Sequence, residues 1–410
     1  MALNIIWVAF FVIAFVIALF KLIFLGDTAI FKLLADGIFD SAKVSVMDVA
    51  LPLAGTMVFF LGLMNIAEKA GAIQKLAKWM NPFLSRLFPE VPANHPAMGQ
   101  MVMNFSANML GLDNAATPFG LKAMESLQSL NPDKEKATNA QIMFLVLHTS
   151  GLTIIPLTII SYRLAAGSTD AASIFIPCVL ATIGTTLASI LMVGFYQKLK
   201  WDKVLISWLL GLIGLMSGVL FLVNGLSPAN KEVVSKVVGN GLLIFIIVII
   251  ILGGVYKKVS VFDAFIEGAK NGFDVVLKII PYLVAMLVAI RVFRDSGAMN
   301  YILDGLTYLI QLTSVNADFI PALPVAIMKP LSGSGARGMM LDIFQTSGPD
   351  SFVGKLASIF QGSADTTFYI IALYFGSVGI KKVRYAIWAG ILADLIGVVI
   401  AILIGYTFFR

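Results

Sequence analysis

The sequence predicts an all-α polytopic membrane protein with about nine full spans. Apolar residues make up 59% of the 410-residue chain, charged residues make up only 13%, and long apolar runs recur from one end to the other. Soluble domains carry about 25% charged residues, so this chain has too few charges to cover a surface in water. These observations exclude a soluble enzyme, a nucleic-acid-binding protein and a disordered scaffold as descriptions of the whole chain.

Each expected span is an apolar run of about 20 residues, the length that crosses a hydrocarbon core. The first run has no basic segment before it and no small-residue cleavage site after it, so we expect a retained helix and no signal peptide. The nine runs are residues 4–25, 49–68, 138–162, 172–197, 204–223, 237–256, 273–293, 352–378 and 385–408.

Two further stretches, residues 98–127 and 320–344, are apolar but interrupted by Gly, Pro, Asn and Ser. Irregular backbone at membrane depth persists only where it packs against protein or lines a watery cavity. We therefore expect broken or re-entrant helices here, and these stretches are the first candidates for a binding site.

The chain also repeats itself weakly. Ala42-Lys43 and Gly71-Ala72 in the first half have counterparts in Ala269-Lys270 and Gly297-Ala298, which lie 227 and 226 residues further on. In both halves an amphipathic segment, an interrupted stretch and a span entered through a polar Ser/Thr run follow in the same order. The sequence thus predicts two domains, residues 1–200 and 201–410, each with one repeat.

Charge placement suggests that the two repeats are inverted relative to each other. Cytoplasmic loops carry an excess of Lys and Arg, and counting spans between the basic loops starts the first repeat outside and the second inside. Inverted repeats whose broken helices meet at the midplane are the build of many secondary transporters. Counting from the basic loops places Lys381, Lys382 and Arg384 inside, whereas Lys21, Lys32 and Lys43 fall outside. The loops counted from contain Lys198, Lys200, Lys203, Lys257 and Lys258.

The first interrupted stretch is rich in amides and hydroxyls. A buried carboxamide without partners costs about 1 to 3 kcal/mol, and three Asn within eleven residues seldom serve packing alone. They suit recognition of a neutral polar solute such as a nucleobase, sugar or amide; the alternative is that they cap half-helices. The candidate substrate-binding residues are Asn104, Ser106, Asn108, Asn114 and Thr117.

The second interrupted stretch contains Ser332 and Ser334 between Lys329 and Arg337. A broken helix exposes N–H groups at its new N-terminus, and together with either cation these groups favour an anion. The alternative is close helix packing through small residues. A phosphate-binding loop is not expected, because its spacing and the preceding strand are missing.

Asp365 is the ionisable residue that we weight most, because a carboxylate inside a span usually faces a partner or a water-filled path. It is a candidate for coupling to H⁺ or Na⁺, or it pairs with Lys329 or Arg337 for structure alone. Further substrate-binding candidates come from the two Ser/Thr runs: His148, Ser150, Ser363, Thr366 and Thr367.

No metal, cofactor or catalytic activity is predicted. The two histidines, His95 and His148, are far apart, His148 fits best as a hydrogen-bonded member of its Ser/Thr run, and the single Cys178 excludes an intramolecular disulfide. No spacing of nucleophile and base supports a hydrolase, so the chain is not expected to be an enzyme.

The sequence resembles two bacterial spore maturation families over nearly its whole length. Residues 95–99 (HPAMG), 104–112 (NFSANMLGL) and 114–120 (NAATPFG) are similar to spore maturation protein A. Residues 330–336 (PLSGSGA), 348–351 (GPDS), 366–369 (TTFY) and 384–386 (RYA) are similar to spore maturation protein B, as if the two were fused near residue 200.

This resemblance implies a nucleoside-recognition (Gate) membrane fold with paired repeats in a bacterial inner membrane. Fold alone does not name a substrate. Three positions depart from the residues expected for the family, since His148 stands in place of Asn, Lys329 in place of Arg and Asp365 in place of Glu.

The sequence thus favours a secondary, ion-coupled transporter of a small polar metabolite, with nucleoside-like solutes among the candidates. Its expected partners are the lipid bilayer and that solute, not nucleic acid, and a homo-oligomer stays open. The rival is a non-transporting membrane scaffold in envelope or spore maturation. A channel or Fe²⁺ pathway is weaker, because soft and carboxylate ligands are sparse in the interrupted stretches.

Overall fold

The computed structural model describes residues 2–313 and 315–410, and for residues 2, 3, 113–115 and 228 it describes the backbone alone. The described residues form helices, and the sole strand-like pairing among them is an isolated bridge between Lys136 and Lys382. The all-α prediction is confirmed.

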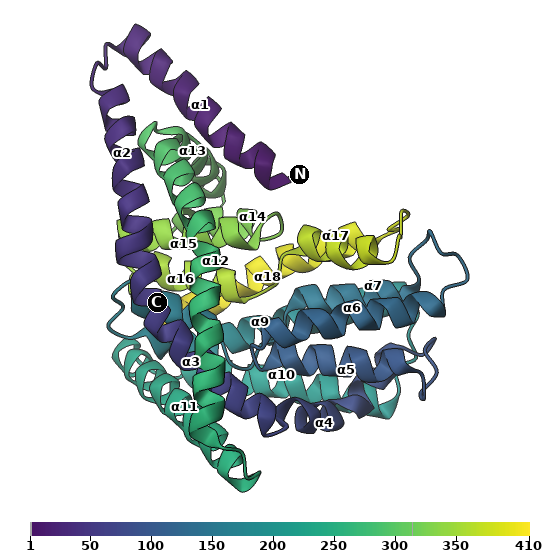
Figure 1. Cartoon of the computed structure of the whole chain (residues 1–410). Coiled ribbons are helices and arrows are strands. Elements are labelled where there is room, and N and C mark those ends of the chain that lie inside the picture. The colour runs from purple at the N-terminus through teal and green to yellow at the C-terminus, as the bar shows by residue number, and fades with distance from the viewer. Residues whose placement is uncertain (1, 314) are drawn as a thin grey trace.

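One group of helices runs from top to bottom of Figure 1, some of them nearly upright and the others slanted. Small residues let two of them touch along their backbones: a Cβ on Gly272 of α12 would lie 2.7 Å from the Cα of Val58 on α3. The first helix leans away from the body and exposes its apolar side chains, as a lipid-facing helix does. The group consists of α1 (Ala2–Leu25), α2 (Ile30–Val44), the π-helix η1 (Ser45–Ala50), α3 (Leu51–Lys69), α11 (Pro228–Tyr256) and α12 (Val261–Asp295).

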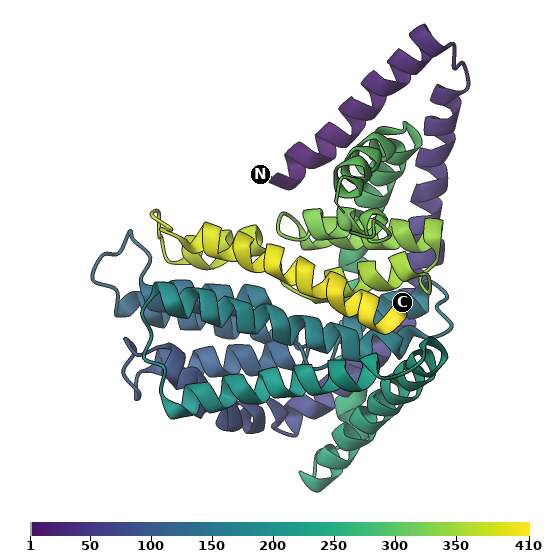
Figure 2. The same cartoon turned by 180° about the vertical axis from the view of Figure 1, so that it is seen from behind.

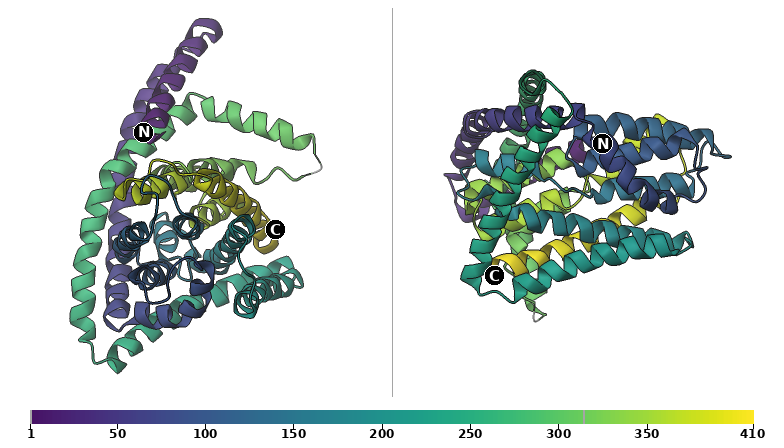
Figure 3. Two further views of the ribbon diagram at one scale, coloured as in Figure 1. Left: turned by 90° about the vertical axis from the view of Figure 1, so that its right-hand side faces the viewer. Right: turned by 90° about the horizontal axis from the view of Figure 1, so that it is seen from below.

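A second group runs across the first, and the left panel of Figure 3 looks along its axes. Local sequence fixes several of the helix ends. A capping box of Thr138 and Gln141 begins α7, and Asp202 caps α10. The helices are α4 (Ala72–Leu87), α5 (Pro96–Met109), α6 (Asp113–Ser129), α7 (Asn139–Ser150), α8 (Leu157–Ala165), the 3₁₀ turn η2 (Ala171–Ile174), α9 (Phe175–Tyr196) and α10 (Lys203–Asn224).

The C-terminal third fills the angle between these two groups. Figure 2 shows its last helix, α18, crossing the back of the molecule beside α9. Contact between them is close at Gly397, where a Cβ would lie 2.8 Å from Thr185 Oγ1. The elements are α13 (Ala298–Gln311), the 3₁₀ turn η3 (Ile320–Ala322), α14 (Leu323–Met328), α15 (Gly333–Ser347), α16 (Phe352–Gly362), α17 (Thr367–Ser377) and α18 (Ala386–Phe409).

Seven helices within the described residues are long and apolar enough to cross a membrane, compared with the nine that the sequence predicts. The two missing spans, at 138–162 and 352–378, are discontinuous: α7 breaks before α8, and α16 breaks before α17. The seven are Asn4–Leu25, Ile30–Lys69, Ala171–Tyr196, Lys203–Asn224, Ala229–Tyr256, Val261–Asp295 and Ala386–Phe409. The chain is a multi-pass membrane protein.

The two halves carry the same order of elements. In the first, α3 and α4 lead to the α5–α6 pair and then to the broken helix α7–α8. In the second, the end of α12 and α13 lead to the α14–α15 pair and then to the broken helix α16–α17. Both interrupted stretches are therefore helix pairs around a short break, while the inverted orientation and the boundary at residue 200 stay predictions.

Candidate functional site

The two discontinuous helices meet at their breaks, residues 151–156 and 363–366. The backbone N–H of Asp365 donates to the carbonyl oxygen of Thr149 over 2.7 Å, which links the second break to the end of α7. Gly151 suits this turn because its backbone is left-handed (φ 59°), a conformation that residues with a side chain rarely adopt. A backbone contact thus joins the two repeats.

Each break also receives the tip of the helix pair from its own repeat. In the first repeat, the Ile154 N–H donates to the Met109 carbonyl oxygen over 2.8 Å. In the second, the Phe368 N–H donates to the Pro330 carbonyl oxygen over 3.1 Å. At the end of α5, the N–H groups of Gly111 and Leu112 bond back to Asn108 and Ala107, which is a Schellman motif. The breaks of both discontinuous helices and the tips of both helix pairs therefore meet at one place.

We call the place where the two breaks meet the crossing, and His148 is its polar centre. It lies in the last turn of α7, and its Nδ1 is 3.0 Å from Asn104 Oδ1 and 2.9 Å from Asn108 Nδ2. Tyr374 on α17 brings its hydroxyl to 3.4 Å from the ring nitrogens, and Asp365 Oδ2 lies 3.7 Å from Nε2. His148 thus binds two amides of α5 as well as groups of the second repeat, rather than belonging to its own Ser/Thr run alone.

A cavity of about 180 Å³ opens beside this cluster and has walls from both repeats. Asp365 is 46% exposed in its side chain, whereas His148 is 4% exposed. Two cations and one carboxylate line the cavity, so its formal charge is positive when His148 is neutral. The polar lining comprises Asn108, His148, Thr153, Thr158, Lys329, Arg337, Gln361 and Asp365. We call this space the central cavity.

A second cavity, of about 190 Å³, lies between α3 and α12. It shares Gly111, Thr158 and Arg337 with the central cavity, and Asn65, Glu68 and Asn271 add polar groups to its walls. We call it the α3–α12 cavity. The two spaces adjoin at Arg337.

The cationic candidates from the second interrupted stretch both face the central cavity. Lys329 Nζ donates to the backbone oxygen of Gln361 over 2.8 Å, at the end of α16, where a helix attracts cations. The Arg337 guanidinium lies 5.1 Å from the ring centroid of Tyr162. Asp365 Oδ2 faces His148 Nε2 at 3.7 Å, a partner that the sequence did not suggest.

Several predicted hydroxyl residues bond within their own segment instead. Ser106, Ser150 and Ser363 donate to carbonyl oxygens three or four residues earlier, and Ser150 also contacts Thr186 on α9. Ser332 caps α15 by accepting the Gly335 N–H over 3.0 Å. These four hydroxyls therefore bond to the helices on which they lie or which they cap.

The remaining predicted substrate-binding residues lie in different parts of the structure. Ser334 lines a third cavity, of about 200 Å³, with Arg337. Thr366 packs its hydroxyl against Gly333 at the break, and Thr117 is half-buried on α6 without lining the central cavity. Asn114 lies on α6, but its side chain falls outside the described residues.

Thr367 leads to a carboxylate that sequence reasoning missed. Its hydroxyl donates to Asp394 Oδ2 over 2.7 Å, and Asp394 is 8% exposed on α18. A lone carboxylate inside a 24-residue apolar helix is itself a signal, because such residues usually face a partner.

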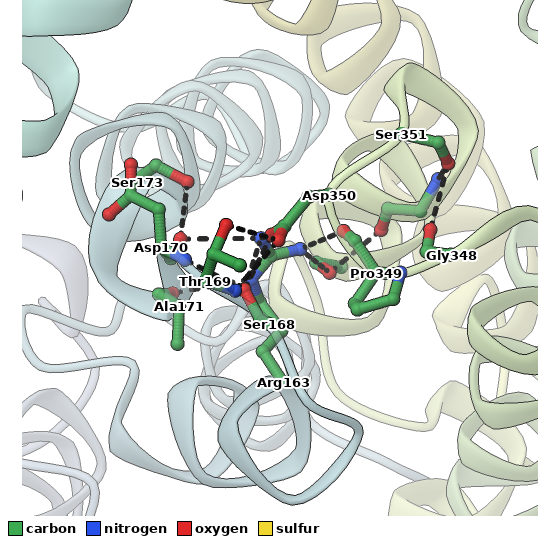
Figure 4. Close-up of polar contacts among 12 residues, drawn as sticks. Arg163, Ser168, Thr169, Asp170, Ala171, Ser173, Gly348, Pro349, Asp350 and Ser351 are labelled. Carbon is green, nitrogen blue, oxygen red and sulfur yellow. Dashed lines mark hydrogen bonds and ion pairs between the residues drawn. The ribbon is translucent and has the colours of Figure 1, made fainter.

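The sequence also gave no warning of the buried Arg163 (Figure 4). From the end of α8 it reaches into the loop between α15 and α16, where it donates to Pro349 O over 2.6 Å and to Asp350 Oδ1 over 2.8 Å. Asp350 also accepts from Ser168 and Thr169. Arg163 is 0% exposed, and we call this group the Arg163 cluster. It joins the two repeats away from the central cavity.

Among the described residues, no group of three His, Cys, Asp or Glu side chains is placed to hold a metal ion. The chemistry that the crossing offers is hydrogen bonding by amides and an imidazole, together with the charges of Asp365, Lys329 and Arg337.

Comparison with known proteins gives a family match in two places. A family model described as nucleoside recognition (Gate) matches residues 50–167 and 276–381, together more than half of the chain. These segments contain both discontinuous helices and both helix pairs, so the matched regions are those that build the central cavity.

Two relatives come from Bacillus subtilis (strain 168). Spore maturation protein B is 50% identical over 155 residues, which are 38% of this chain and 85% of the relative. Spore maturation protein A is 37% identical over 200 residues, which are 49% of this chain and 98% of the relative.

Proposed function

Because this chain belongs to the nucleoside-recognition (Gate) family, within its spore maturation A and B group, we propose that it is a secondary transporter that carries a small polar metabolite across the bacterial inner membrane. It is proposed to act without enzymatic chemistry and without a cofactor. The observation that carries the proposal is the central cavity at the crossing of both discontinuous helices, since transporters place their sites where broken helices meet.

Substrate binding is assigned to the amide and imidazole groups on the cavity side of the crossing. Asn108 and His148 both line the cavity. Asn104 contacts the same ring nitrogen of His148 as Asn108 does, and its Nδ2 donates to Ala116 O over 2.7 Å. A polar solute is recognised in an apolar surrounding because its own hydrogen-bonding groups are otherwise left unpaired.

Ion coupling is assigned to His148 and Asp365. A proton on His148 would place a positive charge 3.7 Å from the Asp365 carboxylate, while a neutral His148 leaves that carboxylate to the cavity. Because the two residues belong to different repeats, protonation would change the attraction across the crossing. A proton or Na⁺ bound at Asp365 would also change this attraction, because it neutralises the carboxylate. We therefore link cation binding at Asp365 to the opening and closing of the cavity.

The test is uptake into liposomes that contain the purified protein. An imposed proton or sodium gradient should drive accumulation from a mixture of nucleosides, bases, amino acids and organic acids, measured by mass spectrometry. Asp365→Asn should abolish the gradient-driven part and leave thermal unfolding unchanged. Asp304→Asn, at an exposed position on α13, is the matched control and should transport normally.

A non-transporting membrane scaffold is the second candidate. It is favoured by the self-contained hydrogen bonds of Ser106, Ser150 and Ser363. If liposomes accumulate no member of the mixture under a gradient of either direction, transport is rejected, and the scaffold is tested next by cross-linking the protein to its neighbours in the native membrane.

A further inference from the structure

Three cavities meet at one arginine. Arg337 lines the central cavity, the α3–α12 cavity and the third cavity beside Ser334, with volumes of about 180, 190 and 200 Å³. It lies in the first half of α15, close to the break at residues 329–332. A molecule that occupies any of these spaces can therefore reach its guanidinium.

Arg337 is poorly satisfied by the protein. Its Nε is buried and has no hydrogen-bond partner, whereas the rest of its guanidinium rests on the Tyr162 ring and bonds to that side chain. Of the seven arginines, five pair with a carboxylate, and Arg337 and Arg384 form no such pair among the described residues. An unpaired cation within a membrane protein is costly and usually marks a substrate or ion path.

A second, independent group in the same wall also lacks a partner. Gln361 lines the central cavity and is 5% exposed, and its Oε1 is buried without a hydrogen bond. The backbone oxygen of the same residue accepts from Lys329. The wall of the central cavity therefore holds a guanidinium N–H and an amide oxygen that are buried and have no partner in the protein.

These unused groups define a complementary ligand. Arg337 would bind anionic oxygens, as its planar fork does with carboxylates and phosphates, and Gln361 Oε1 would accept one N–H or O–H. Lys329 and Arg337 outnumber Asp365 in the lining, so the cavity favours negative charge. A cavity of about 150 Å³ holds benzene, so the central cavity of about 180 Å³ admits a small molecule.

We propose that the central cavity binds a small organic anion, a metabolite with a carboxylate or phosphate group and a hydrogen-bond donor, through Arg337 and Gln361. This assignment rests on the proposed transport function and names the substrate class for it. A neutral nucleoside would leave the Arg337 guanidinium unpaired.

The experiment measures thermal unfolding of the purified full-length protein with matched pairs of probes. The pairs are succinate and its diamide, benzoate and benzamide, and adenosine monophosphate and adenosine, with inorganic phosphate as a further probe. Charged members of at least one pair should raise the unfolding temperature, whereas their neutral counterparts should not. Comparing the pairs shows whether the cavity binds carboxylates or phosphates.

Two variants locate the binding. Arg337→Gln should weaken binding of the stabilising anion at least tenfold. Arg384→Gln is the matched control, because Arg384 also lies over a tyrosine ring, at 5.2 Å from the Tyr385 centroid, but lines none of these cavities. It should bind the anion as the unaltered protein does. Without any probe, Arg337→Met should unfold no earlier than the unaltered protein.

The outcomes separate this inference from the transport proposal. The inference is overturned if no probe stabilises the protein, if neutral and charged partners act equally, or if Arg337→Gln binds normally. If a gradient drives uptake of neutral solutes alone, the transport proposal stands and the anion site is rejected. If an anion binds but no solute is taken up, the anion site stands and the transport proposal is rejected.

Discussion

Arg163 on α8 and Arg337 on α15 both lie in the helices around the two breaks, but one is fully hydrogen-bonded by the protein and the other is not. All three guanidinium nitrogens of Arg163 donate to protein oxygens, which include Pro349 O and Asp350 Oδ1. Arg337 has an aromatic ring on one side, cavities around it and a buried Nε without a partner. A satisfied arginine holds the structure together, whereas an unsatisfied one is available to a ligand.

The strongest test of this difference between the two arginines is the substitution Arg163→Met. Removing one partner of a buried ionic cluster leaves the other groups unpaired and costs about 3 kcal/mol of unfolding free energy. Denaturant unfolding in mixed micelles measures it. The control is Arg86→Met, whose pair with Asp202 is exposed on both sides and should lose less than about 1 kcal/mol. Equal losses in the two variants would contradict the role of the Arg163 cluster.

A smaller loss is expected for Asp350→Asn. The carboxylate accepts from Arg163, Ser168 and Thr169, but its side chain is 32% exposed, so water replaces part of what is lost. We expect about 1.5 kcal/mol of destabilisation, as for a hydrogen bond to a charged group. In a double-mutant cycle the same change should cost little once Arg163 is Met; full additivity would show that the two residues act separately.

The Asp350 loop also predicts a pH dependence. Burial raises the pKa of the Asp350 carboxyl, but hydrogen bonds from Ser168 and Thr169 and the charge of Arg163 outweigh it and hold the pKa below its ordinary value of 3.8. This carboxylate therefore stabilises the fold above about pH 4 and loses that contribution as the pH falls through its lowered pKa. Unfolding measured from pH 6 to pH 3 should show an acid loss that is reduced in Asp350→Asn; an unchanged profile would refute the assignment.

The smallest effect is expected at the cavity. Gln361→Met removes a buried amide whose Oε1 has no partner, so the unfolding free energy should stay within about 1 kcal/mol or rise. Gln141→Met is the matched control, because that buried side chain bonds to Thr138 and Gln128. Its loss should be clearly larger in the same thermal measurement. A greater loss for Gln361 would mean that its amide serves the fold.

Much of the architecture could be read from the sequence because it depends on local pattern. The breaks in the α5–α6 and α14–α15 pairs follow from Gly, Pro and Asn in apolar stretches. At residues 151–156 and 363–366 the sequence predicts polar entrances to full spans, whereas the structure has breaks. Averaging hydropathy over 20 residues hides a short interruption between two apolar half-helices.

The candidate site was predicted only in part, because its geometry depends on distant pairs. His148 and Asp365 were both singled out, but their contact joins the two repeats and has no local signature. Tyr374, Gln361 and Arg163 were missed for the same reason: each resembles an ordinary member of its helix. Asp394 is different, since a lone carboxylate in an apolar span could have been recognised from the sequence.

The hydrogen bond between the Thr149 carbonyl and the Asp365 N–H involves main-chain atoms alone. No exchange of side chains deletes it, apart from a proline at position 365, which would remove the donor. The frame of the crossing can thus persist while the groups that face the cavity are replaced one at a time. Such a molecule can acquire a new selectivity during evolution without first rebuilding its scaffold.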